Sequence, residues 1–161
     1  MEMTEKTLND KSIVLRLSCP ALGREGVSFL LTGDIELKGE EALLERGIPL
    51  ESTFLKVPHH GSHSSSGKAF VSSVSPRVAL VSVGAHNSYR HPDPEVLAAY
   101  EAFGIKVYRT DQDGALIVEA GPGGEAPRIK SYREAAVEKV KWDQPAGRVE
   151  WKNIKRIFSW F

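Results

Sequence analysis

Apolar positions along the chain follow two spacings, one typical of strands and one typical of helices. Short apolar runs rich in β-branched residues predict strands at 12–19, 27–32, 52–57, 77–84, 105–110 and 115–120. Wider spacing, bounded by glycine or proline, predicts helices at 39–47, 66–75 and 93–104. Because strands alternate with helices, the pattern predicts an α/β fold in which helices cover a mixed sheet.

Three of these strands carry more information than the others. Residues 77–84, "RVALVSVG", are almost continuously apolar, so we expect both faces of this strand to be buried. Residues 12–19 and 27–32 are joined by a short glycine-containing connection and are expected to pair as in a hairpin. We therefore expect the sheet to begin with two paired strands and to have 77–84 as a strand in its buried centre.

Composition and charge divide the chain into two parts. The 161 residues, 41% of them hydrophobic, suit one globular domain, and 21 basic and 21 acidic residues cancel. Residues 1–121 carry 12 basic and 16 acidic residues, whereas 122–161 carry 9 and 5. We therefore assign 1–121 to the domain and 122–161 to a linker and a basic, aromatic-ended tail. Such a tail could contact nucleic acid or a membrane surface, or could be an ordinary solvated face.

Membrane insertion and export have no signal in this sequence. No apolar stretch approaches the roughly 18 residues that a bilayer span requires. The start, "MEMTEKTLND", lacks the apolar segment of a signal peptide, and the single Cys19 cannot form an internal disulfide. We expect a soluble, unexported chain.

All five histidines lie between positions 59 and 91, and they follow strand ends. Asp34 comes after the strand at 27–32, His59 and His60 after 52–57, and His91 after 77–84. Because ligands of α/β domains gather at the carboxyl ends of strands, this pattern predicts a transition-metal site for zinc or manganese.

Each of these residues also has an ordinary structural interpretation. Asp34 could satisfy backbone donors in a turn, and His60 could be a hydrogen-bonded histidine without a ligand. His63 is expected to be an exposed loop residue, and the serine run 64–66 could cap the helix that follows. His59 and His60 would point to opposite sides if the backbone there is still extended.

Four segments in order carry a resemblance to a known family. They are "FLLTGDIELKGEEALLERG", "LKVPHHGSHSSSGKAF", "PRVALVSVGAHNSYRHPDPEVLAAY" and "GIKVYRTDQDGALIV". Together, over about residues 9–120, they resemble the C-terminal metallo-β-lactamase-like domain of the ComEC family of competence DNA-uptake channels. The resemblance implies the second half of an αββα fold and metal-dependent hydrolysis of phosphodiesters, in which the non-transported DNA strand is degraded.

The same resemblance implies roles for individual residues. Asp34 matches a bridging metal ligand and His60 a late histidine ligand of a site that holds up to two ions. His59 and His91 match positions that act on the phosphate or the leaving oxygen, and Ser62 and Asn87 match phosphate-facing positions. The implied partners are single-stranded DNA, the first half of the domain and a membrane channel, so the complete protein would be membrane-associated.

The chain also departs from the family pattern. The family's early cluster, His-x-(His/Asp)-x-Asp-His, is absent, and Arg90 stands where the family has glycine. Two alternatives therefore remain beside the nuclease. One is a non-catalytic remnant or accessory DNA-binding module, and the other is a different hydrolase of the same fold, such as a phosphodiesterase.

Overall fold

A computed structural model describes residues 7–20, 26–121, 126–135 and 157–160. Its main sheet has five strands in the order β1-β2-β3-β4-β5. β1 is antiparallel to β2, and the other neighbours are parallel. The strands are β1 (Leu15–Cys19), β2 (Val27–Leu31), β3 (Phe54–Lys56), β4 (Val78–Val81) and β5 (Lys106–Arg109).

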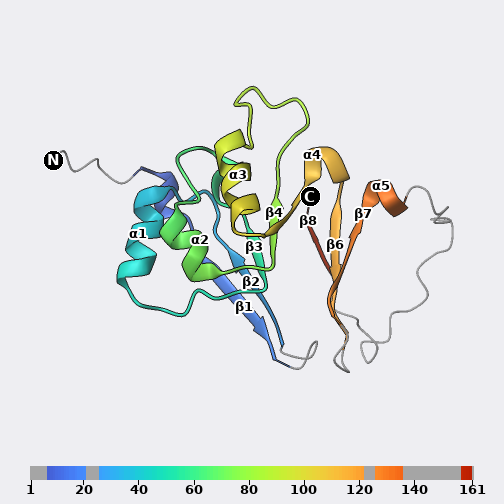
Figure 1. The fold of residues 1–161 in the computed structure, drawn as a ribbon, viewed down its shortest axis with the longest axis horizontal. Helices are drawn as coiled ribbons and strands as arrows, with labels where there is room; N and C mark the ends of the chain where they lie inside the picture. The colour runs from blue at the N-terminus through green and yellow to red at the C-terminus, as the bar shows by residue number, and fades with distance from the viewer. Residues whose placement is uncertain (1–6, 21–25, 122–125, 136–156, 161) are drawn as a thin grey trace.

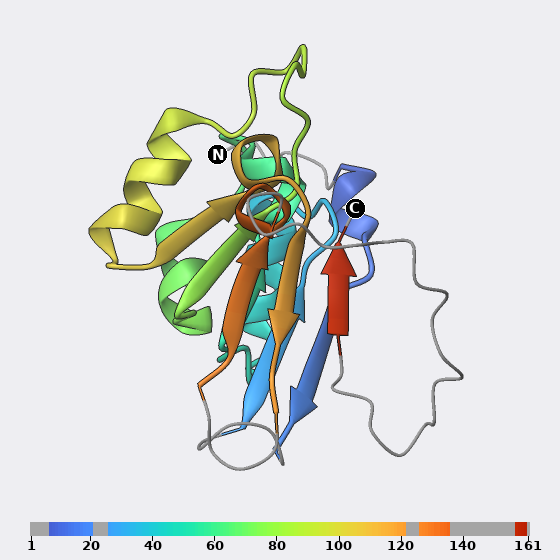
Figure 2. The same ribbon diagram turned by 90° about the vertical axis from the view of Figure 1, so that its right-hand side faces the viewer.

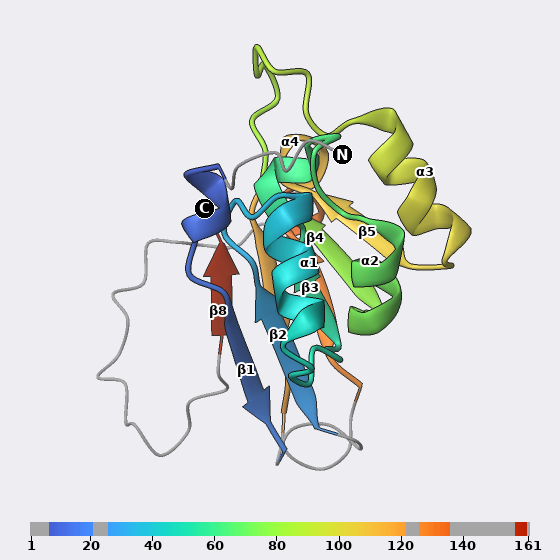
Figure 3. The same ribbon diagram turned by 90° about the vertical axis from the view of Figure 1, so that its left-hand side faces the viewer.

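Three helices cover one face of this sheet (Figure 1, Figure 3). They are α1 (Leu37–Glu45), α2 (Lys68–Val74) and α3 (Pro94–Ala102), and each connects two neighbouring parallel strands. Right-handed crossovers that all advance in the same direction place their helices on the same face. The core beneath them contains Leu55, Phe70, Val81 and Tyr100, all at most 1% exposed.

A second sheet covers the opposite face (Figure 2). It has the order β7-β6-β8 and consists of β6 (Leu116–Glu119), β7 (Arg128–Ser131) and β8 (Ile157–Trp160), all antiparallel. Phe29 and Phe54 of the main sheet stack at 4.7 Å between ring centroids and pack with Leu116 and Val118 of β6. The described part of the chain therefore has three layers, helices, sheet and sheet.

The first helix begins against a short 3₁₀ turn, η1 (Asn9–Lys11). Asp10 Oδ1 accepts the backbone N–H groups of Glu36 and Gly39, each at 2.9 Å, so Asp10 caps α1 from outside the helix. A Cβ at Gly39 would lie 2.8 Å from that oxygen, which explains a glycine inside a helix.

The six predicted strands and three predicted helices are all present. The hairpin-like pairing of β1 with β2 is confirmed, and so is the burial of β4, whose Ala79 and Leu80 face the two different cores. Between β5 and β6 the chain forms a one-turn helix, α4 (Thr110–Asp113).

The fold confirms an α/β protein with a mixed sheet. In the segment after residue 121, β7, β8 and the short α5 (Tyr132–Ala135) are described, and both strands pair with β6. Within the segment 122–161 that we assigned to a linker and a tail, residues 122–125, 136–156 and 161 lie outside the described residues. In the described parts of the chain, no helix is long and apolar enough to cross a bilayer.

Candidate functional site

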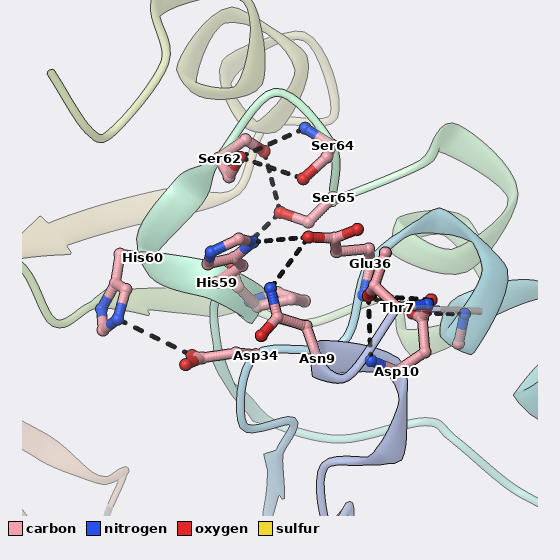
Figure 4. A network of polar contacts seen from close by, with 12 residues as sticks. Thr7, Asn9, Asp10, Asp34, Glu36, His59, His60, Ser62, Ser64 and Ser65 are labelled. Atoms are coloured by element: carbon pink, nitrogen blue, oxygen red, sulfur yellow. Dashed lines mark hydrogen bonds and ion pairs between the residues drawn. The ribbon is translucent and has the colours of Figure 1, made fainter. Parts of the chain in front are cut away.

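Predicted site residues follow the carboxyl ends of β2, β3 and β4. Figure 4 shows those after β2 and β3, namely Asp34, His59, His60 and Ser62. Asp34 follows β2, and His59 and His60 lie in the 3₁₀ turn η2 (Pro58–Gly61) after β3. Asn87 and His91 lie in the long connection between β4 and α3. The parallel order of these strands thus gathers segments that are far apart in the sequence.

The turn that carries the two histidines has an unusual backbone. His59 (φ 44°, ψ 44°) and His60 (φ 56°, ψ 18°) are both left-handed, which costs about 1–3 kcal/mol for each non-glycine residue. The backbone there is not extended. The alternation of side chains expected of a strand, in which His59 and His60 would point to opposite sides, therefore does not apply to this turn. The neighbouring loop holds the turn, because Gly61 O accepts the Asp93 N–H at 2.8 Å and a Cβ at Gly61 would lie 2.6 Å from Pro92.

His60 is held so that one ring nitrogen faces Asp34. Its Nδ1 lies 2.7 Å from the Ser82 carbonyl oxygen, which can only accept, so Nδ1 carries the proton. In the neutral ring, Nε2 then has a lone pair, and it lies 3.7 Å from Asp34 Oδ1. A lone pair beside a carboxylate is favourable only with a proton or a cation between them. Both side chains are over 40% exposed, so a cation can reach them.

Within the described part of the chain, the Asp34 side chain does not cap a turn by accepting a backbone N–H. Its backbone N–H donates to Ser12 Oγ at 3.1 Å, and its carboxylate faces His60. Lys56 is also near: burial lowers the pKa of its amine, while the charge of Asp34 acts in the opposite direction. The Asp34 carboxylate and the His60 imidazole together are a pair of donors that suits zinc or manganese.

His59 faces a different carboxylate. Its Nδ1 lies 3.3 Å from Glu36 Oε1, is buried, and makes no hydrogen bond within the described structure. Glu36 Oε1 also accepts from Asn9 Nδ2 at 2.9 Å. The ring of His59 lies 6.2 Å from that of His60 and 5.8 Å, edge-on, from that of His91.

His91 lines a pocket of about 430 Å³ together with His60, Asn87, Tyr89 and Thr110. Its ring stacks on Tyr89 at 5.8 Å. Burial lowers the pKa of His91, and the neighbouring histidines lower it further. The neutral imidazole is therefore the favoured form at neutral pH.

Asn87 and Ser62 make bonds inside their own loops. Asn87 donates to the carbonyls of Gly84 and His91 and accepts the His91 N–H at 2.8 Å, so it fixes the backbone of His91. Ser62 is buried, and its hydroxyl lies 3.0 Å from that of Ser64. Their predicted contact with phosphate stays a prediction.

Other sequence expectations are resolved by this geometry. His63 is exposed, as expected, and so is His86. The serine run does not cap α2, whose N-cap is Gly67 without a side-chain bond; instead Ser66 Oγ lies 3.0 Å from Tyr100 Oη. Arg90 has φ 58°, a left-handed conformation that suits the glycine of the family pattern better than arginine.

Sequence reasoning missed the residues behind the histidine turn. Glu36 and Asn9 were not predicted, and neither was Glu40, which is 2% exposed and accepts the N–H groups of Ser66 at 2.6 Å and Gly67 at 2.8 Å. For Glu40, the sequence held one signal of a buried role, which was a charged residue on the apolar side of an amphipathic helix. Among the described residues, no three histidine, cysteine, aspartate or glutamate side chains are grouped so as to hold a metal, so the pair of Asp34 and His60 stands alone.

The chain is similar in sequence to part of several known proteins. No protein-family model matches the chain. It is 42% identical over 127 residues to competence protein ComA of Neisseria gonorrhoeae, an alignment covering 78% of this chain and 18% of that protein. It is 37% identical over 108 residues to ComE operon protein 3 of Bacillus subtilis, covering 67% of this chain and 13% of the relative.

A third relative, the uncharacterized protein YcaI of Escherichia coli, is 38% identical over 108 residues, which is 66% of this chain and 14% of that protein. The chain thus spans less than a fifth of the length of these curated relatives. It is a homologue of one short part of proteins named for competence.

Proposed function

We propose that the chain is the C-terminal portion of a metallo-β-lactamase-like domain of a ComEC-type competence protein, and that this domain hydrolyses phosphodiesters. Its substrate would be the DNA strand that is not transported during uptake. Similarity to competence proteins supports a role in DNA uptake. The pairing of His60 Nε2 with the Asp34 carboxylate supports metal-dependent hydrolysis.

Asp34 and His60 are the residues of this chain that would hold zinc or manganese. A bound divalent cation lowers the pKa of water and stabilises the negative charge that develops on phosphate oxygens. The carbonyl of Ser82 would keep His60 in the required tautomer, as backbone acceptors do for metal-bound histidines.

We propose that His59 and His91 act on protons and on the phosphate beside that pair. The centroids of the His59 and His91 rings lie 5.8 Å apart, and His91 favours its neutral form. A neutral imidazole can accept a proton at one nitrogen or donate one at the other, as general acid–base catalysis requires.

A complete site needs more donors than this pair. Tight zinc sites use three or four protein ligands, and the described residues supply two. We propose that the other ligands, including those for a second ion, come from the first half of the domain. The length of the relatives leaves room for that half and for a membrane channel.

The shortage of donors also favours a second candidate function. In it, the chain is a non-catalytic module of the same fold that contacts DNA without a metal. The two candidates differ in one measurable property, which is whether Asp34 and His60 bind a divalent cation.

The test is the binding of manganese or zinc to the purified chain, measured at equilibrium with free metal present, because two donors hold a metal weakly. We expect bound metal in the parent chain and at least a tenfold loss of affinity in Asp34→Ala and His60→Ala. His63→Ala is the matched control, because it removes an exposed histidine from the same loop. Metal that is absent, or unchanged in Asp34→Ala and His60→Ala, would reject the hydrolase for this chain and favour the non-catalytic module.

A further inference from the structure

Glu36 connects the start of the chain to His59. One oxygen of its carboxylate accepts from Asn9 Nδ2 at 2.9 Å and lies 3.3 Å from His59 Nδ1 (Figure 4). The Glu36 side chain is 18% exposed and that of His59 24%, so water has limited access to the contact. Within the described structure, His59 Nδ1 itself is buried and has no hydrogen-bond partner.

The Glu36 side chain has no role at the helix that it precedes. It occupies the N-cap position of α1 but makes no capping hydrogen bond there. The Asp10 carboxylate does the capping instead, by accepting the backbone N–H groups of Glu36 and Gly39. The side chain of Glu36 is therefore available to His59.

The chemistry of the contact determines where the imidazole proton lies. A carboxylate can only accept, so a neutral His59 is stabilised with its proton on Nδ1 and a lone pair on Nε2. The Asn9 amide holds the carboxylate in place, and Gly33 O accepts the His59 backbone N–H at 3.3 Å. We propose that Glu36 is a positioning residue, which fixes His59 in the Nδ1–H tautomer and so makes its Nε2 the proton acceptor at this site.

This inference deepens the proposed function and rests on it for its catalytic meaning. His59 Nε2 would take a proton from the attacking water as the O–H bond breaks, and the released electron pair would form the bond to phosphorus. The P–O bond to the leaving oxygen would then break, with its electrons on that oxygen. The imidazolium that forms carries its charge next to the Glu36 carboxylate, which stabilises it, as in a carboxylate–histidine pair of a hydrolase.

The proton position is directly measurable by nuclear magnetic resonance of the ring nitrogens. The chain is labelled with ¹⁵N and studied at alkaline pH, where imidazoles are neutral. The His59 signal is assigned with His59→Gln. We expect a protonated Nδ1 and an unprotonated Nε2 in the parent chain, and a mixture of both tautomers in Glu36→Ala.

Two further variants separate positioning from folding. Glu36→Gln keeps an acceptor oxygen and is expected to restore the Nδ1–H tautomer. Glu41→Ala is the matched control, since it removes an exposed carboxylate from α1 that pairs with Lys38, and it should leave His59 unchanged. The amide spectrum of each variant shows whether it is folded.

The outcomes are distinct from those of the metal test. A protonated Nε2 on His59 in the parent chain, or an unchanged tautomer in folded Glu36→Ala, would overturn the positioning role. Neither readout requires a metal or hydrolysis. A chain that binds no metal but shows the Glu36-dependent tautomer would therefore reject the proposed hydrolase and keep the positioning role.

Discussion

At the scale of single residues, carboxylates behind the histidine turn organise the site. Glu36 faces His59, whereas Glu40 holds the loop that follows, by accepting the Ser66 and Gly67 N–H groups. Burial raises the pKa of Glu40 to about 7, although the two backbone hydrogen bonds act to lower it. The protonated form of Glu40 is thus favoured in the folded state relative to the unfolded chain.

Glu40 therefore predicts a dependence of stability on pH. A raised pKa gives stability that is fully present below the unfolded value of 4.5 and is lost as the pH rises through about 7. Relative to Glu40→Gln, the free energy of unfolding of the parent chain should fall by up to about 1 kcal/mol per pH unit between these values. Urea denaturation at several pH values measures this, and parallel curves for the two proteins would contradict it.

At the scale of elements, the position of α1 depends on a cap from η1. Asp10 accepts two helix N–H groups and also the N–H and hydroxyl of Thr7. Burial acts to raise the pKa of Asp10, but its hydrogen bonds outweigh that effect and lower it below 3.8. The ionised form is thus stabilised in the folded protein and belongs to the structure at neutral pH.

Removal of this cap should cost stability. We expect Asp10→Ala to reduce the free energy of unfolding at neutral pH by about 1–2 kcal/mol, because the first turn of α1 loses an acceptor. Lys11→Ala, an exposed neighbour, should change it by less than about 0.5 kcal/mol. Because the pKa of Asp10 is lowered, the difference between the parent chain and Asp10→Ala should shrink as the pH falls below 3.8. Urea titrations at pH 7 and pH 3 test both statements, and equal stability of all three proteins at pH 7 would refute them.

At the scale of the whole molecule, the main sheet is buried between helices and a second sheet. Phe29 and Phe54 fill the space between the two sheets, and each is at most 4% exposed. This second core buries apolar side chains from the face of the main sheet opposite the helices. The rigid sheet that results holds the strand ends at which the site residues lie.

The packing between the sheets gives a prediction for the fold. Phe29→Ala removes a stacked ring from this core and should lower the free energy of unfolding by about 3–5 kcal/mol. Leu15→Ala, on the edge strand β1 and 46% exposed, should cost less than about 1 kcal/mol. Thermal and urea unfolding compare them, and similar losses in both variants would show that the second sheet contributes little.

The sequence predicted those features that depend on neighbouring residues. Apolar spacing and Gly or Pro stops predicted the six strands of 12–120 and the three helices, all of which are present. The meeting of Asp34 with His60 also followed, because parallel strands end at one edge. Metal binding, the roles of His59 and His91, the phosphate contacts of Ser62 and Asn87, and the domain boundary at 121 stay predictions.

The sequence by itself determined the order of the elements and the segments that would face the site, because hydrophobic periodicity and turn residues act over a few positions. Only the tertiary structure decided which atoms meet there. The contact of Glu36 with His59, the hold of Ser82 on His60 and the pairing of β8 with β6 all join residues distant in the chain. Such contacts depend on the packing of whole layers and on the left-handed backbone of η2, which no local pattern encodes.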